Sequence, residues 1–157
     1  MDFNADSFNL FDKEWALVTA GVPDRYNTMT ISWGGLGTLW GKPVATVYVK
    51  PCRYTHDFMD ENDYFTVSFY PEKYRRALGL LGSLSGRDGD KVKMAGLTPK
   101  ALNGAVTFCE AKVTLLCKKT YRQDMDTSAM PAEVVEDYYK TEAPHTMYIG
   151  EVMDILI

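Results

Sequence analysis

Small hydroxyl side chains recur along one segment of this sequence, and a cationic segment follows a short distance later. Thr28, Thr30 and Ser32 alternate with other residues, so in an extended chain their hydroxyls share one face. A second, apolar strand is predicted next, and Arg53 and Thr55 follow it at the start of a predicted helix. A guanidinium and a hydroxyl beside free helix N–H groups can bind a phosphate. Together the two segments could hold a flat polar ring along the strand and a phosphate at its end.

Each of these residues also has an ordinary structural explanation. Threonine and serine are common in strands, where they need no ligand. Thr55 could cap the predicted helix, and Arg53 could be a solvated surface charge. From residue types alone, the structural explanation is the more frequent one for patterns of this length.

A glycine-rich loop over residues 85–91, with the sequence Ser-Gly-Arg-Asp-Gly-Asp-Lys, is the second candidate for binding chemistry. Ser85, Arg87 and Lys91 could reach an anionic ligand from this loop. The alternative is a solvated turn in which Asp90 caps the next helix. On the residues alone, the solvated turn is the favoured interpretation.

Several common catalytic and binding motifs are incomplete in this sequence. A dinucleotide-binding fingerprint that begins at Gly35 would need a third glycine where Trp40 stands. A serine hydrolase elbow over residues 82–86 would place Leu84 at the nucleophile position. The chain has two histidines, three widely spaced cysteines and no Cys-x-x-Cys pair, so neither a metal site nor a disulfide framework is predicted.

Composition limits the class of protein. The 157 residues fit a single domain over 1–157, and 46% hydrophobic with 24% charged residues is typical of a globular chain. A net charge of −4 argues against nucleic acid as a partner, because phosphate backbones bind basic surfaces. No apolar run is long enough for a membrane span, and the acidic N-terminus does not resemble a signal peptide. With reduced thiols as the simplest state of the cysteines, a cytoplasmic location is expected.

Apolar alternation predicts a mainly β protein with short helices between the strands. The strands are predicted at residues 15–20, 28–33, 44–50, 64–69, 106–120 and 147–157, and the segment 106–120 is long enough for two. Helices are predicted at residues 53–61, 71–81, 90–95 and 131–139. The glycine-rich stretch 34–41 is predicted to be a turn. The regular strand–helix alternation of a parallel sheet is missing, which favours a small barrel.

Three segments, in this order, resemble the flavin reductase-like family. They are Asn-Thr-Met-Thr-Ile-Ser-Trp at 27–33, Lys-Pro-Cys-Arg-Tyr-Thr at 50–55, and Ser-Gly-Arg-Asp at 85–88 followed by Asp90 and Lys91. The similarity runs from about Trp15 to about Val152. Members are FMN-binding split-barrel proteins, and flavoredoxin is a close relative. The resemblance implies a six-stranded split β-barrel that forms a homodimer and binds FMN near the subunit boundary.

The resemblance also implies a set of cofactor-binding residues. They are Asn27, Thr28, Met29, Thr30, Ser32, Trp33, Lys50, Arg53, Thr55, Ser85, Arg87 and Lys91. Donors of the 28–33 strand would bind the pyrimidine edge of the flavin, while Arg53 and Thr55 would bind its phosphate. His145 stands where the family often has a histidine near the open face of the flavin, and a polar residue at a strand entry is the alternative. No side chain is expected to act as an obligatory base.

The function implied is that of an FMN-binding flavoprotein oxidoreductase. NAD(P)H would deliver hydride to the flavin, and electrons would pass to free flavin or to a redox partner protein. The alternative is a flavoredoxin-like electron carrier without NAD(P)H activity of its own. A haem-binding split barrel is a third reading, to which two histidines give little support. Some relatives have Cys-Gly before the Ser-Gly-Arg-Asp run, where this chain has Leu81 and Gly82.

Overall fold

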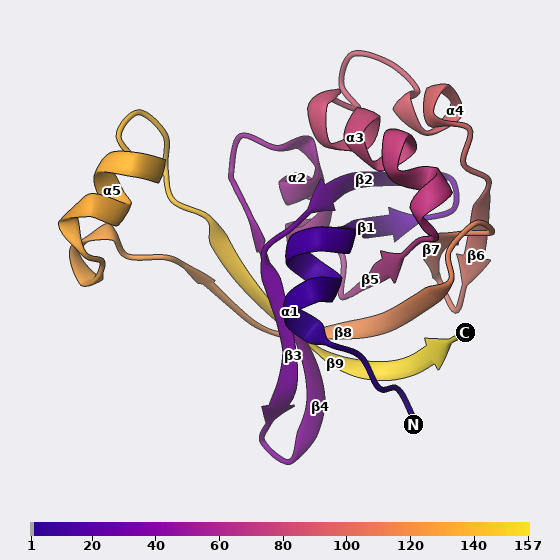
Figure 1. The fold of residues 1–157 in the computed structure, drawn as a ribbon, viewed down its shortest axis with the longest axis horizontal. Helices are drawn as coiled ribbons and strands as arrows, with labels where there is room; N and C mark the ends of the chain where they lie inside the picture. The colour runs from indigo at the N-terminus through magenta and orange to yellow at the C-terminus, as the bar shows by residue number, and fades with distance from the viewer. Residues whose placement is uncertain (1) are drawn as a thin grey trace.

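The computed structural model describes residues 2–157. Position 1 of the predicted domain 1–157 is therefore outside the described residues. Seven antiparallel strands form one curved sheet, and a two-stranded hairpin lies beside it (Figure 1). The strands of the large sheet are β1 (Ala16–Val22), β2 (Arg25–Ile31), β3 (Gly34–Leu39), β4 (Lys42–Val49), β5 (Tyr64–Phe69), β8 (Val113–Asp124) and β9 (Thr146–Leu156). The hairpin is formed by β6 (Pro99–Leu102) and β7 (Ala105–Phe108).

Short helices fill the connections. They are α1 (Ser7–Asn9), the π-helical turn η1 (Leu10–Glu14), α2 (Tyr54–Glu61), the 3₁₀ turn η2 (Glu72–Tyr74), α3 (Arg75–Ser83), α4 (Lys91–Ala95), the 3₁₀ turn η3 (Thr127–Ala129) and α5 (Ala132–Tyr138). Helix α5 stands away from the barrel, at the tip of an arm that leaves through the end of β8 and returns through the start of β9 (Figure 1). None of the helices described is long and apolar enough to cross a membrane.

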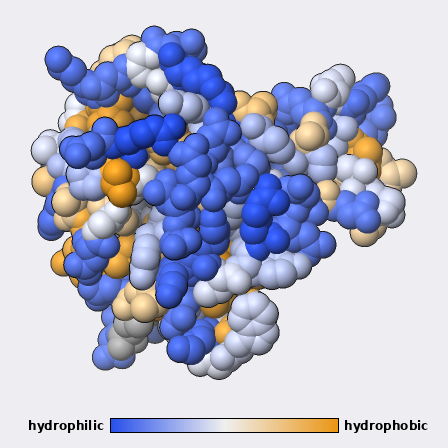
Figure 2. Space-filling view, turned by 180° about the vertical axis from the view of Figure 1, so that it is seen from behind, coloured by the Kyte–Doolittle hydropathy of each residue, from blue (hydrophilic) through white to orange (hydrophobic). Residues whose placement is uncertain are grey.

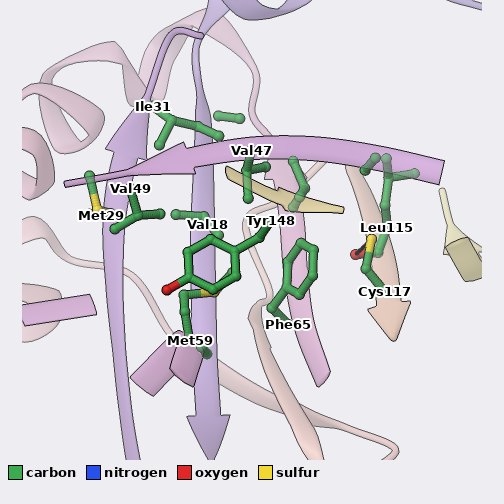
Figure 3. Close-up of a cluster of buried hydrophobic side chains, with 14 of the residues drawn as sticks. Val18, Met29, Ile31, Val47, Val49, Met59, Phe65, Leu115, Cys117 and Tyr148 are labelled. Carbon is green, nitrogen blue, oxygen red and sulfur yellow. Dashed lines mark hydrogen bonds between the residues drawn. The ribbon is translucent and has the colours of Figure 1, made fainter. Parts of the chain in front are cut away.

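The sheet curls around one apolar core. Alternate residues of β5, such as Phe65 and Val67, point inward and are almost completely buried, as their period of two predicts. Tyr148 of β9 fills the middle of this core with its ring, next to Phe65 (Figure 3). Gly150 makes room for this packing, because a Cβ there would lie 2.6 Å from the Phe65 ring. The core therefore fixes the relative positions of the strands that carry the site.

A second apolar layer lies on the outside of β1. Leu78 and Leu81 of α3 pack there against Leu17, and Phe108 of β7 closes the layer. The molecular surface seen from behind is mostly hydrophilic, with scattered apolar residues (Figure 2). Helix α3 is thus held against the sheet by burial of its apolar face.

The strand order is β2-β1-β5-β8-β9-β4-β3, so β2 and β3 lie at the two ends of the sheet. In the chain only Ser32 and Trp33 separate them. The chain therefore crosses from one end of the sheet to the other at this point, and the barrel is split there. The predicted split-barrel class is confirmed.

The number of strands differs from the prediction, since the described residues form nine strands instead of six. The segment Gly34–Leu39 is a strand and not a turn: it pairs with β4 along its whole length, from Gly34 opposite Val47 to Leu39 opposite Lys42. The turn is confined to Trp40 and Gly41, whose φ values of 52° and 72° suit a two-residue hairpin. Strand β6 was not predicted, and the predicted 106–120 strand is divided into β7 and β8.

Candidate functional site

A cavity of about 270 Å³ opens at the split between β2 and β3. Its walls come from the end of β2, from β4, from the start of α2 and from the start of β9. The residues that line it are Met29, Thr30, Ile31, Ser32, Trp33, Tyr48, Lys50, Arg53 and His145. We call this the ring cavity. Six of these nine residues belong to the cofactor-binding set predicted from the sequence, and His145 was predicted separately near the open face of the flavin.

A second cavity of about 240 Å³ adjoins the first, and Arg53 lines both. We call it the anion cavity. Its other lining residues are Asn27, Cys52, Tyr54, Thr55, Gly82, Ser83, Leu84, Ser85, Gly86 and Lys91. Arg53 is the N-cap residue of α2, with extended backbone angles, so it stands at the positive end of that helix. The helix therefore begins one residue later than predicted.

Two cations meet in the anion cavity. The Arg53 Nη2 donates to the carbonyl of Gly82 at 3.0 Å. The Lys91 Nζ donates to the carbonyls of Leu81 and Leu84 at 3.2 and 3.1 Å. Over residues 2–157, neither cation forms an ion pair with a carboxylate. Both positive charges are therefore available to an anionic group.

Lys91 has an unusual electrostatic environment for a lysine, because the residue is only 4% exposed. Burial, together with the positive charge of Arg53, lowers the pKa of its ammonium group to about 8. Keeping the ammonium charged at this position costs free energy as long as no negative charge is near. An anion between Lys91 and Arg53 would offset that cost.

Helix α2 is tied to β2 by a buried hydrogen bond beside these cations. The Asn27 Nδ2 donates to the Thr55 Oγ1 at 2.7 Å. Because this bond occupies the hydroxyl oxygen as an acceptor, the hydroxyl proton of Thr55 is available for a second partner. Gly86 lies directly over this pair, and a Cβ at Gly86 would be 2.1 Å from the Asn27 Oδ1. The close approach of the loop therefore requires glycine at this position.

Of the predicted hydroxyl face on β2, only part reaches the ring cavity. Thr28 is completely buried, and its hydroxyl lies 2.8 Å from that of Thr19 on β1. The Thr30 hydroxyl donates to the carbonyl of Leu78 in α3 at 2.5 Å. The Ser32 hydroxyl has no hydrogen-bond partner among the residues described and lines the cavity. Ser32 is thus the side chain of this face that is free to bind a ligand.

The loop after α3 contributes two of its three predicted residues to the anion cavity, Ser85 and Lys91. Arg87 lies outside both cavities and is exposed. Its guanidinium stacks 4.7 Å above the ring of Tyr54 and forms an ion pair with Asp57 at 3.4 Å. Asp90 caps α4 by accepting a hydrogen bond from the Lys93 backbone N–H, as the structural alternative predicted.

His145 lines the ring cavity from the opposite side, at the base of the arm. The residue is 9% exposed, and its Nδ1 lies 2.7 Å from the hydroxyl of Tyr139. Burial and the charge of Lys50 lower the pKa of His145 to about 4, although Glu142 opposes this shift. The imidazole is therefore neutral at pH 7. Glu142 also forms an ion pair with Lys50 at 2.5 Å, which neutralises that cation.

Among the residues of this region that were not predicted from the sequence, two have polar side chains close to His145 or Lys50, Tyr139 and Tyr48. A signal existed for Tyr48, because it lies two residues before Lys50 in the strand predicted at 44–50 and would therefore share its face. Tyr139 gave no such signal: it follows α5, and only the fold of the arm returns its hydroxyl to His145.

The comparisons with known proteins agree with the fold described above. The profile of the flavin reductase like domain matches residues 8–157. Flavoredoxin of Desulfovibrio vulgaris (Miyazaki F) superposes with a TM-score of 0.72 at 24% identity, covering 100% of this chain and 76% of that one. Flavoredoxin from Methanosarcina acetivorans gives 0.74 at 18% identity, covering 99% and 74% of the two chains.

An FMN-binding protein from Thermus thermophilus, with bound p-hydroxybenzaldehyde, gives a TM-score of 0.73 at 19% identity over 99% of this chain and 81% of that one. A search of curated proteins found no match. At these identities the structural likenesses show the fold alone. The family match covers nearly the whole chain, and the chain therefore belongs to the flavin reductase-like family.

Proposed function

We propose that this protein binds FMN, with the isoalloxazine in the ring cavity and the phosphate in the anion cavity. The observation that carries the proposal is the pair of cations, Arg53 and Lys91, which have no carboxylate partner among residues 2–157 and lie beside the N-terminus of α2. Helix N-termini and paired cations favour a phosphate group. Because Arg53 lines both cavities, a ligand with a ring and a phosphate fits the arrangement.

The residues present suit each part of such a ligand. Apolar and aromatic side chains, among them Met29 and Trp33, provide walls for a flat ring. The free Ser32 hydroxyl provides a polar contact, and Thr55 can donate its proton towards a phosphate oxygen. Bound FMN would supply the electron and hydride chemistry, whereas the protein binds and orients it. Since His145 is neutral at pH 7, it is not required as a charged acid.

We further propose that NAD(P)H is the electron donor. The ring cavity continues into a groove of about 850 Å³, and the two share Ser32, Trp33 and Tyr48. This groove offers space for a second planar reactant next to the proposed flavin position. A flavoredoxin-like electron carrier would have no need of that space, although it would share the FMN site.

The same groove exposes apolar surface that a second subunit could cover. Phe8 and Trp33 both line this groove, and they are 88% and 46% exposed. We therefore propose a homodimer, and a redox partner protein as a further acceptor of electrons.

Cys52, Cys109 and Cys117 are all unpaired, which supports a reducing compartment such as the cytoplasm.

An absorption spectrum of the purified protein, soaked in FMN and then desalted, tests FMN binding directly. The visible bands of oxidised flavin are expected to remain with the protein. Anaerobic addition of NADH or NADPH is then expected to bleach these bands at a rate compatible with turnover. Bands that persist after both donors would support the carrier instead, and a titration that shows no FMN binding would contradict the proposal.

A further inference from the structure

His145 is held by a hydroxyl that the arm supplies. Tyr139 directly follows α5, and its oxygen lies 2.7 Å from the Nδ1 of His145. The two rings also pack edge to face, with centroids 5.6 Å apart. No other hydrogen bond of the Tyr139 hydroxyl is found among the residues described. The hydroxyl is therefore dedicated to this imidazole.

The chemistry of the two groups gives the direction of this hydrogen bond. A phenol is a strong donor, whereas the unprotonated nitrogen of a neutral imidazole is a strong acceptor. If Tyr139 donates to Nδ1, the single proton of the neutral ring must be on Nε2. The charged groups that face the ring, Lys50 and Glu142, form an ion pair with each other. Neither of them therefore replaces Tyr139 as the partner of Nδ1.

The other ring nitrogen has a free position. The Nε2 of His145 has no hydrogen-bond partner among residues 2–157. Over the same residues, no fully buried side-chain nitrogen or oxygen lacks a partner. Nε2 must therefore be accessible, and the open space that His145 lines is the ring cavity.

We propose that Tyr139 is a positioning residue, which fixes His145 as the neutral tautomer that presents its Nε2–H to the ring cavity. This arrangement suits a neutral acceptor oxygen on the second reactant, namely the oxygen of a carboxamide, aldehyde or ketone. A carboxylate gains less here, because the donor is uncharged and the nearby Lys50 is already paired with Glu142. The tautomer stands independently of the proposed function, whereas the class of reactant rests on it.

Nitrogen NMR of the imidazole rings tests the tautomer without any assay of activity. The chain has only two histidines, so the spectrum of the uniformly ¹⁵N-labelled protein contains two ring systems. At neutral pH, His145 is expected to show a protonated Nε2 and an Nδ1 whose lone pair accepts a hydrogen bond. Tyr139→Phe is expected to shift that Nδ1 signal to the position of a free lone pair. A proton on Nδ1 in the unmodified protein would overturn the proposal.

Tyr138→Phe is the matched control. Tyr138 packs its ring 5.3 Å from that of Trp33, but its hydroxyl has no hydrogen-bond partner among the residues described. Loss of this hydroxyl is therefore expected to leave both signals of His145 unchanged. The pair of variants separates the specific hydrogen bond from a general disturbance of the arm.

Steady-state kinetics with NADH as the probe adds the functional readout. Tyr139→Phe is expected to lower kcat/KM by about five-fold, roughly the value of one neutral hydrogen bond, with an unchanged Kd for FMN. His145→Gln, which keeps an N–H donor, is expected to retain more activity than His145→Phe. An unchanged kcat/KM in Tyr139→Phe would refute the role in positioning. Absence of FMN binding would instead contradict the proposed function and leave the tautomer intact.

Discussion

The anion cavity predicts that Arg53→Ala weakens the binding of FMN far more than that of riboflavin. Riboflavin has the same ring system but lacks the phosphate. The Arg53 guanidinium uses one donor on the Gly82 carbonyl, and the others have no ion-pair partner in the part of the chain that the structure describes. Its bonds to a phosphate would therefore be new and charge-assisted, each contributing about 1.5–3 kcal/mol.

One effect of the same substitution acts in the opposite direction. Removal of the Arg53 charge takes away a repulsion that lowers the pKa of Lys91, so the ammonium group stays protonated more firmly. We therefore expect a net loss at the lower end of the range, about ten-fold in the Kd of FMN, since each 1.4 kcal/mol is a factor of ten.

Fluorescence titrations of both flavins against the unmodified protein and the variant would measure this difference. Arg76→Ala is the control, since Arg76 is exposed on α3 and its side chain forms no hydrogen bond or ion pair within residues 2–157. It is expected to change neither Kd. If Arg53→Ala weakened the binding of FMN and of riboflavin equally, the arginine would not bind the phosphate. An unchanged affinity for FMN would mean that the phosphate binds elsewhere.

Three further predictions concern the same region. Gly86→Ala should displace the loop from Asn27, because the Oδ1 of Asn27 would be 2.1 Å from the new Cβ. The substitution should lower the free energy of unfolding by about 1–3 kcal/mol in urea titrations, and it should also lower the affinity for FMN. Unchanged FMN binding would contradict the close packing. The preference for FMN over riboflavin should decline as pH rises above about 8, because the ammonium of Lys91 loses its proton there. Lys91→Met should abolish this pH dependence when both flavins are titrated from neutral pH upward. The free energy of unfolding should fall by at most about 3 kcal/mol as pH falls from 6.5 to about 4, because the His145 imidazole takes up a proton at a higher pH in the unfolded chain than in the folded one. In His145→Gln the urea midpoint should decline less steeply over this pH range. An equal decline in the variant would count against a depressed pKa of His145.

Elements determined by local rules could be predicted from the sequence. Strand β5 has the bounds predicted for it, 64–69, because its alternating side chains form half of a buried face. Helix α4 begins at its Asp90 cap and ends at Gly96, whose φ of 76° is easily adopted by glycine. In each case the information lies within a few residues of the element itself.

Elements that depend on a distant partner could not be predicted in this way. Half of the residues of strand β3 are glycine and few of the others favour strands, and it forms because β4 offers it a complete edge of backbone hydrogen bonds. Its extended backbone comes from that pairing, which a pattern within 34–39 does not reveal.

The candidate site shows the same division. The β2 segment and Arg53 line the cavities, as their types and spacing suggest. Thr28 is turned to the interior, because Thr19 lies opposite it on β1, and Arg87 is drawn to Asp57 on α2. Which hydroxyl or cation remains free for a ligand depends on tertiary neighbours.

The meeting of Arg53 and Lys91 also has a consequence for the lifetime of the protein in a cell. Without an anion the folded chain holds two like charges together, one of them buried, and an anion that binds only the folded state would raise its stability by mass action. The unliganded form would open more often and would therefore be degraded first by proteases. If the anion is the phosphate of FMN, the amount of this protein would follow the supply of its cofactor without any dedicated regulator.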